Sequence, residues 1–299
     1  MALDAGNTDI EWQKVLELGI NHEQQHQELF LYDIKRILGD NPLNPVFRQQ
    51  KAVPDSSISK KWLTVPEGVY PIGYEGEGFH FDNEEGLHNV YLHSYEIDSG
   101  LVTNKEYLEF MEDGGYSSFQ YWFQEAWDWV NLESIKSPRY WSKEGGEWWH
   151  YTLGGYEKVD MSDPVSHLSY YEADAFARWK GCRLPTEFEW EVACKRFSQE
   201  VPSDANFIEK KYFKPIQSEG IGFFGNLWEW TSSAYSAYPY FKVADGALGE
   251  YNGKFMVNQM VLRGGSFGTS YDHIRPTYRN FFHPHLRWLF SGIRLAKHL

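Results

Sequence analysis

The chain has 299 residues, with 42 acidic against 28 basic side chains and a net charge of −14. An acidic chain is repelled by nucleic-acid phosphates and anionic lipid surfaces, and no run of 18 apolar residues is present, so we expect no nucleic-acid or membrane partner. Two cysteines, Cys182 and Cys194, are too few for a disulfide framework, and the first residues do not resemble a signal peptide, which together predict a cytoplasmic protein.

The segment Asp9–Leu38 has the one strong helical pattern of the chain, with Thr8 or Asp9 suited to cap its start and Gly39 its end. Its apolar residues form more than one stripe, so this helix needs cover on more than one side, and no second long amphipathic helix follows it. We therefore predict that residues 1–39 are the last part of a helical bundle. An exposed apolar face should cause self-association that deletion of the segment relieves.

This helix carries the run N-H-E-Q-Q-H-Q-E. His22 and His26 are one turn apart and project from the same face, so both imidazoles can reach one metal ion. Gln25 lies one turn after His22, beside the same face, where it could touch a molecule next to the metal. Glu28 lies about 200° around the helix axis from His26, which favours a packing role over ligation.

Two other interpretations of the run stay open. The histidines could be structural residues on an acidic helix. The run also satisfies H-E-x-x-H, the helix of zinc metalloproteases in which Glu23 would be the general base. Such a protease needs a third ligand, and no glutamate occurs between Glu28 and Glu67, so the zinc protease is a minor alternative.

Residues 40–61 lack periodicity and are predicted to be a linker, and residues 62–299 a second domain. The aromatic content of the whole chain, 18%, together with its 26 glycines favours irregular loops held by large rings. Patterns in this domain predict short strands within 62–74 and 89–97, helices over 103–113, 170–180 and 185–197, and mostly loops and short strands afterwards.

Three motifs stand in this domain: R-L-P-T-E-F-E-W-E from Arg183, G-N-L-W-E-W from Gly225 and R-G-G-S-F from Arg263. Each motif alone predicts framework residues that form turns and pin loops. Together they resemble the formylglycine-generating-enzyme and sulfatase-modifying-factor domain, an irregular α+β fold related to C-type lectins, and Trp62–Tyr107 fits its start. Formylglycine enzymes use a cysteine pair shortly after G-G-S, and here no cysteine follows Cys194, so we expect no thiol-dependent formylglycine chemistry.

With the H-x-x-x-H-x-E helix added, the chain is similar to the ergothioneine-type sulfoxide synthases, in which a DinB-like four-helix bundle precedes this domain. The resemblance implies a non-haem Fe(2+) enzyme of ergothioneine biosynthesis. Such an enzyme uses O2 to join the sulfur of cysteine or γ-glutamylcysteine to the imidazole ring of hercynine, the trimethylated betaine of histidine, as a sulfoxide. Neutral imidazoles with open positions on iron suit this chemistry.

The resemblance also implies roles for individual residues. His22 and His26 match iron ligands, and Gln25 and Asn280 match contacts to hercynine. Tyr238, in the loop after W-E-W, matches the region of a proton donor in some members, although a buried tyrosine bonded to a backbone carbonyl is the alternative. Phe281 and Phe282 stand where the mycobacterial type has Trp-Asp, and this pair matches relatives that use free cysteine.

One departure concerns the third iron histidine, which the family carries on the first helix of its bundle. Only 21 residues precede His22, and none is histidine. The chain is therefore expected to be truncated, split or degenerate. In the split case, a separate helical-bundle chain that supplies the third histidine is an expected partner. The alternative function is a non-catalytic, lectin-like module that binds a small betaine or peptide.

Overall fold

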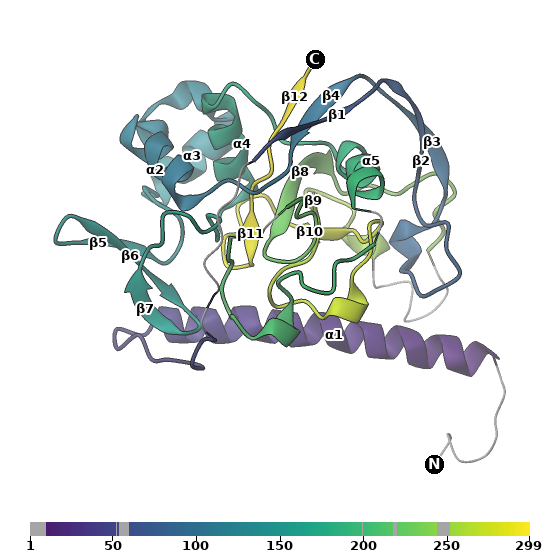
Figure 1. The fold of residues 1–299 in the computed structure, drawn as a ribbon, viewed down its shortest axis with the longest axis horizontal. Helices are drawn as coiled ribbons and strands as arrows, with labels where there is room; N and C mark the ends of the chain where they lie inside the picture. Colours follow the sequence, from purple (N-terminus) through teal and green to yellow (C-terminus); the bar gives the residue numbers. More distant parts are fainter. Residues whose placement is uncertain (1–9, 52, 54–59, 199, 218–219, 244–251) are drawn as a thin grey trace, which may run out of the picture.

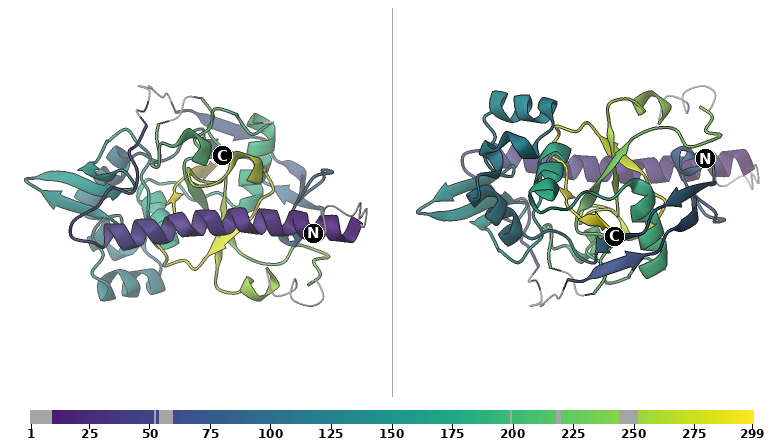
Figure 2. Two further views of the ribbon diagram at one scale, coloured as in Figure 1. Left: turned by 90° about the horizontal axis from the view of Figure 1, so that it is seen from below. Right: turned by 90° about the horizontal axis from the view of Figure 1, so that it is seen from above.

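The computed structural model describes residues 10–51, 53, 60–198, 200–217, 220–243 and 252–299. One long helix, α1 (Ile10–Gly39), lies along one face of an irregular α+β domain (Figures 1 and 2). The helix is continuous through Gly19, and its predicted N-caps lie outside the described residues. Gly39 is its last residue. A Cβ there would lie 2.7 Å from the Tyr151 ring, so the close approach of that ring requires glycine.

In the part of the domain that the structure describes, short strands form four small sheets. The strand orders are β1-β4-β12, β10-β9-β8-β11, β2-β3 and β5-β6-β7. The strands are β1 (Trp62–Val65), β2 (Gly68–Ile72), β3 (His88–Leu92), β4 (Tyr95–Asp98), β5 (Trp141–Glu144), β6 (Glu147–Thr152), β7 (Gly155–Lys158), β8 (Trp228–Ala234), β9 (Met260–Arg263), β10 (Asn280–Phe282), β11 (Ser291–Gly292) and β12 (Ala296–His298).

The remaining helices are α2 (Asn104–Glu112), α3 (Gln124–Leu132), α4 (Tyr170–Trp179) and α5 (Glu187–Phe197). Three of them begin at a capping box, in which Thr103, Ser169 or Thr186 bonds the backbone N–H three residues later and a glutamate there bonds back. These three helices confirm the helices predicted over 103–113, 170–180 and 185–197. Helix α3 and the β5-β6-β7 sheet were not predicted.

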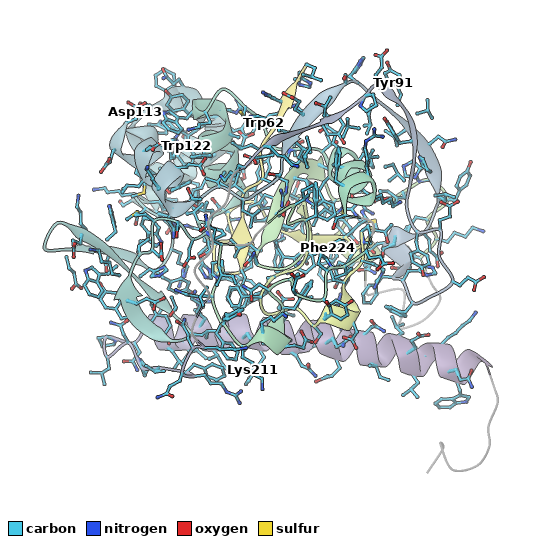
Figure 3. The ribbon with its side chains drawn as sticks, in the orientation of Figure 1. Trp62, Tyr91, Asp113, Trp122, Lys211 and Phe224 are labelled. Atoms are coloured by element: carbon cyan, nitrogen blue, oxygen red, sulfur yellow. The ribbon has the colours of Figure 1, made fainter. Side chains whose placement is uncertain are left out.

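Side chains pack throughout the domain (Figure 3), and the ring of Tyr32 on α1 meets Phe282, Trp288 and Phe290 edge to face. The β8–β9 pair lies at the centre of the largest sheet, and β10 continues that sheet to the edge near α1 (Figure 1). The first part of the expected linker packs on β6 and the turn that follows it. There the backbone N–H of Phe47 donates to Leu153 and the Tyr151 hydroxyl donates to the Pro45 carbonyl. No helix in the described part of the chain is long and apolar enough to span a membrane.

Candidate active site

The two histidines of α1 converge. His22 Nε2 and His26 Nε2 lie 3.1 Å apart, and the rings meet edge to face. Burial lowers the pKa of His22, and the neighbouring His26 lowers it further, while Glu23 opposes the change. Neutral imidazoles present lone pairs, which is the form that binds a metal ion.

Glu28 of the same run fixes α1 to the domain. Its buried carboxylate accepts hydrogen bonds from Tyr32, Trp228, Ser266 and Thr269, at 2.5 to 2.9 Å. Trp228 belongs to G-N-L-W-E-W and Ser266 to R-G-G-S-F, so one side chain of the helix joins both motifs of the domain. This packing role agrees with the prediction for Glu28 and sets the position of His26 and His22, which lie two and six residues earlier on the same helix.

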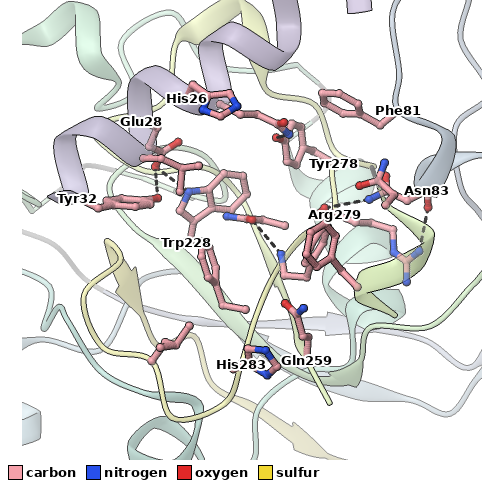
Figure 4. A pocket seen from close by; sticks show the side chains of 18 of the residues that line it. His26, Glu28, Tyr32, Phe81, Asn83, Trp228, Gln259, Tyr278, Arg279 and His283 are labelled. Carbon is pink, nitrogen blue, oxygen red and sulfur yellow. Dashed lines mark hydrogen bonds between the residues drawn. The ribbon is translucent and has the colours of Figure 1, made fainter. Parts of the chain in front are cut away.

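A cavity of about 570 Å³ lies between α1 and β10, and both histidines line it (Figure 4). Aromatic rings dominate its wall: Tyr32, Phe81, Trp228, Phe255, Tyr278, Phe281, Phe282 and Trp288. Its polar groups are His22, Gln25, His26, Glu28, Asn83, Asn252, Lys254, Gln259, Arg279, Asn280 and His283. A wall that combines large aromatic rings with polar groups suits a small organic molecule, and aromatic faces favour a quaternary ammonium group.

The structure brings most of the predicted site residues together in this cavity. Asn280, Phe281 and Phe282 form β10 and line one wall. Phe281 stacks on Tyr235 with ring centroids 4.0 Å apart, and Phe282 meets Trp288 edge to face at 5.3 Å. The Phe281 backbone N–H donates to Asn280 Oδ1 at 2.9 Å. His22, Gln25 and His26 line the opposite wall, on α1.

Tyr238 is the exception. It is buried but does not line the cavity. Its hydroxyl donates to Glu187 Oε2 at 3.0 Å and accepts from Arg263 at 2.9 Å. The phenol is therefore held in a network of charged side chains, with a carboxylate in place of the backbone carbonyl considered from the sequence. In this position Tyr238 contacts framework side chains and is not among the described residues that line the cavity, so its proposed proton-donor role stays a prediction.

The Tyr238 network holds Arg263 of β9 and Arg279, the residue before β10, and Arg279 also lines the cavity. Arg263 bonds Glu187 and Glu191, and Arg279 bonds Glu187 through two nitrogens. Burial acts to raise the pKa of Glu187, but Arg279 and Arg263 outweigh it, and the pKa is lowered. Arginines and glutamates of the three motifs are thus framework residues, as each motif alone predicted.

Tyr278 was not predicted as a site residue, although its ring lines the cavity and its hydroxyl lies 2.5 Å from Gln25 Nε2. Its neighbour in the fold, His273, comes from the short helix η8 (Tyr271–His273). Their proximity to Gln25 depends on a contact between residues more than 240 positions apart. The one available signal was that Tyr278 stands two residues before Asn280.

His22 and His26 are placed to occupy two coordination positions of one metal ion. Two imidazole nitrogens bound at about 2.1 Å in adjacent positions of one ion lie about 3 Å apart, close to the separation of His22 and His26. In the part of the chain that the structure describes, no group of three histidine, cysteine or carboxylate side chains is placed to hold a metal. Glu23, the general base of the protease alternative, is exposed and does not line the cavity.

The sequence matches the family of the sulfatase-modifying factor enzyme 1-like domain over residues 48–213 and 211–299. The hercynine oxygenase of Mycolicibacterium smegmatis is 32% identical over 93% of this chain and 70% of its own length. That of Mycobacterium tuberculosis is 31% identical over 94% and 71%. Among solved structures, Treponema denticola variable protein 1 is similar with a TM-score of 0.54 at 18% identity, over 83% of this chain and 99% of that one.

The irregular α+β domain and its cavity thus define a protein of the sulfatase-modifying-factor class, with the lectin-like fold that the motifs predicted. The long helix α1, which carries the paired histidines, precedes that domain. The chain belongs to the hercynine oxygenase family, whose members are enzymes of the oxygenase type.

Proposed function

We propose that this chain serves a non-haem iron(II), O2-dependent reaction that joins the sulfur of a cysteine-type thiol to the imidazole ring of hercynine. A ring C–H and a thiol S–H are lost, a C–S bond forms, one oxygen atom of O2 becomes the sulfoxide oxygen and the other leaves as water. The observation that carries the proposal is the convergence of His22 and His26 at the mouth of an aromatic cavity. Free thiols at Cys182 and Cys194 support a cytoplasmic location for this reaction.

Iron(II), when held by His22 and His26, supplies the activation of O2. The protein's other groups bind and orient the organic substrate. The trimethylammonium group of hercynine fits among the aromatic rings of the cavity, and Lys254 brings positive charge to the wall for its carboxylate. Gln25 and Asn280 approach the same space from α1 and β10, so the two elements together set the orientation of the bound ring.

The third protein ligand is proposed to come from a separate helical-bundle chain that packs on α1. The outward face of α1 carries exposed apolar side chains, including Trp12, Leu16, Phe30 and Ile37. His26, which is itself exposed, stands beside this face. A helix packed there would cover the apolar side chains and bring its own residues near both histidines.

The test is aerobic incubation of the chain with iron(II), hercynine and cysteine, with and without a helical bundle from a hercynine oxygenase. We expect a sulfoxide conjugate, identified by mass, that forms when the bundle is present, with one O2 consumed per product. His26→Ala should abolish it, whereas His93→Ala, at an exposed histidine away from the cavity, should not. Binding of hercynine without turnover in any mixture would favour the alternative function, a non-catalytic betaine-binding module.

A further inference from the structure

Gln25 presents a buried acceptor to the cavity. Its Oε1 atom has no hydrogen-bond partner among the described residues, although the side chain lines the cavity wall. Leaving a buried carbonyl oxygen without a donor destabilises the folded chain, so such atoms are rare and usually meet a ligand or a water molecule. A ligand in the cavity would be the missing donor.

A chain of hydrogen bonds determines which end of the Gln25 amide faces the cavity. The chain starts at the Glu17 backbone carbonyl, which can only accept, so Asn21 must turn its Nδ2 to it at 3.0 Å. Asn21 Oδ1 then faces His273 Nδ1 at 3.2 Å, which therefore carries the proton. His273 Nε2 is left as an acceptor for the Tyr278 hydroxyl at 3.1 Å.

The last link of the chain orients Gln25. Because the Tyr278 hydroxyl gives its proton to His273, its oxygen accepts from Gln25 Nε2 at 2.5 Å. The amide nitrogen is thereby directed to the tyrosine and the carbonyl oxygen to the cavity. The neutral form of His273 is required, and burial together with nearby Arg275 lowers its pKa to about 3, so the ring is neutral at pH 7.

We propose that Tyr278 and His273 are positioning residues that hold Gln25 with its carbonyl oxygen toward the substrate. The cavity thereby accepts an N–H or an N-methyl group of a cationic imidazole betaine. This inference rests on the proposed function for the identity of the ligand. If the Gln25 amide were turned the other way, its N–H₂ group would face the N–H or N-methyl group of the ligand, and binding would be weaker.

Calorimetric titration with hercynine tests the positioning role. Tyr278→Phe keeps the ring but releases the Gln25 amide, and we expect about tenfold weaker binding. The matched control is Tyr95→Phe, which loses a buried hydroxyl bonded to the Glu189 carbonyl and does not line the cavity. Adding Tyr278→Phe to Gln25→Ala should cause no further loss, because the tyrosine acts through the glutamine. Unchanged binding by Tyr278→Phe, or losses that multiply in the double variant, would overturn the proposal.

A second measurement needs no ligand and separates this inference from the proposed function. Nitrogen NMR of the free chain, with His273 assigned by His273→Gln, reports which ring nitrogen carries the proton. We expect the proton on Nδ1 and a shift of the Nε2 resonance in Tyr278→Phe. A proton on Nε2 would reverse the hydrogen-bond chain and overturn the positioning role, even if hercynine binds. If neither the wild type nor any variant binds hercynine but the NMR result is as expected, the proposed function is contradicted and the positioning of Gln25 still holds.

Discussion

Glu28 is a buried carboxylate whose four hydrogen-bond donors are all uncharged side chains. A carboxylate can accept all of these bonds because it has only lone pairs to offer. This arrangement makes one residue of α1 the point where the helix, Trp228 and the Ser266 turn meet. The position of the paired histidines, and hence of any metal they bind, depends on it.

Glu28→Gln is expected to lower the free energy of unfolding by about 2–3 kcal/mol, since its amide would turn an N–H₂ group toward at least one donor. Urea denaturation followed by tryptophan fluorescence measures the change. Glu17→Gln, at an exposed position of the same helix, is the control and should leave the midpoint unchanged. Equal effects of the two substitutions would show that the Glu28 bonds do not stabilise the docked helix.

The choice of thiol is a second property at the scale of single residues. Phe281 and Phe282 give the cavity wall aromatic rings where a carboxylate could hold the ammonium group of a larger thiol. A reconstituted enzyme should therefore prefer cysteine to γ-glutamylcysteine, as the ratio of kcat/KM for the two thiols reports. Phe282→Asp should move this ratio toward γ-glutamylcysteine by about tenfold, and Phe282→Leu should not. A wild-type preference for γ-glutamylcysteine would refute this assignment.

The surroundings of a residue were predictable where its neighbours lie on the same helix. His22, Gln25 and His26 lie on adjacent faces of one helix because of its 3.6-residue period, and the cavity wall contains all three. The partners of Tyr238 could not be predicted, because Glu187 and Arg263 come from other elements. Tyr278 was missed for the same reason: only the docked fold brings its hydroxyl to Gln25.

At the scale of elements, α1 has an inner face that docks and an outer face that is exposed. Near its C-terminal end, Lys35 is 2% exposed and its Nζ lies 2.6 Å from His167 Nε2. The rings of Tyr140 and Phe290 also surround the amine. Burial lowers the pKa of Lys35 to about 7, against a weaker opposing effect of Glu157.

This buried amine should make stability depend on pH in a defined window. Between pH 7 and about pH 10.4 the unfolded chain keeps a proton on Lys35 that the folded chain has lost, so unfolding takes up a proton. The free energy of unfolding should therefore rise with pH in this window by a few kcal/mol, and level off below pH 7. Urea denaturation at pH 7 and pH 9 measures the rise.

Lys35→Met should remove this rise, while Lys14→Met, at an exposed position of the same helix, should retain it. The comparison of variants isolates Lys35 from tyrosine and cysteine side chains that titrate in the same range. Identical pH dependence in the wild type and Lys35→Met would mean that Lys35 stays charged in the folded chain.

The outer face of α1 supports a prediction about association. Trp12, Phe30 and Ile37 are each more than 60% exposed. Large exposed apolar side chains on one face promote association, so we expect concentration-dependent oligomers in light scattering. The double variant Trp12→Gln/Phe30→Gln should reduce them. A monodisperse wild-type monomer at high concentration would contradict this expectation.

Substitution tests the role of the outer face of α1 in association better than deletion of the helix does. Deletion of Asp9–Leu38 would also remove Glu28 and Tyr32, which are buried against the domain. It would uncover the aromatic wall of the cavity together with Ser266 and Thr269. New apolar surface would then obscure the loss of the outer face.

Helices were predictable where a capping residue was followed by apolar residues at helical spacing. Capping boxes at Thr103, Ser169 and Thr186 marked the starts of α2, α4 and α5. Helix α3 has Phe123 at its N-cap and no side-chain cap bond, so its sequence lacks a start signal. The β5–β6 turn contains Gly145 and Gly146, both with positive φ. A Gly-Gly pair between two short strands is a sequence signal for a hairpin.

At the scale of the whole molecule, the motifs predicted the fold because they supply at least one partner of several of its buried and half-buried ion pairs. Arg294 pairs with Glu229 through two nitrogens, and Arg183 pairs with Glu189 in the same way. An irregular domain with small sheets depends on such side-chain networks to hold its loops. The strand order of the four sheets could not be predicted, because it depends on pairings between distant segments such as β8 and β11.

The central claim is that His22 and His26 form two positions of an iron site, and iron(II) titration of the purified chain under anaerobic dialysis tests it most directly. Because the described residues supply only this pair, we predict weak binding by the chain alone and tighter binding when a helical bundle is added. His22→Ala or His26→Ala should each abolish the binding, and His93→Ala should leave it unchanged. Tight, stoichiometric iron binding that neither His22→Ala nor His26→Ala affects would contradict the assignment.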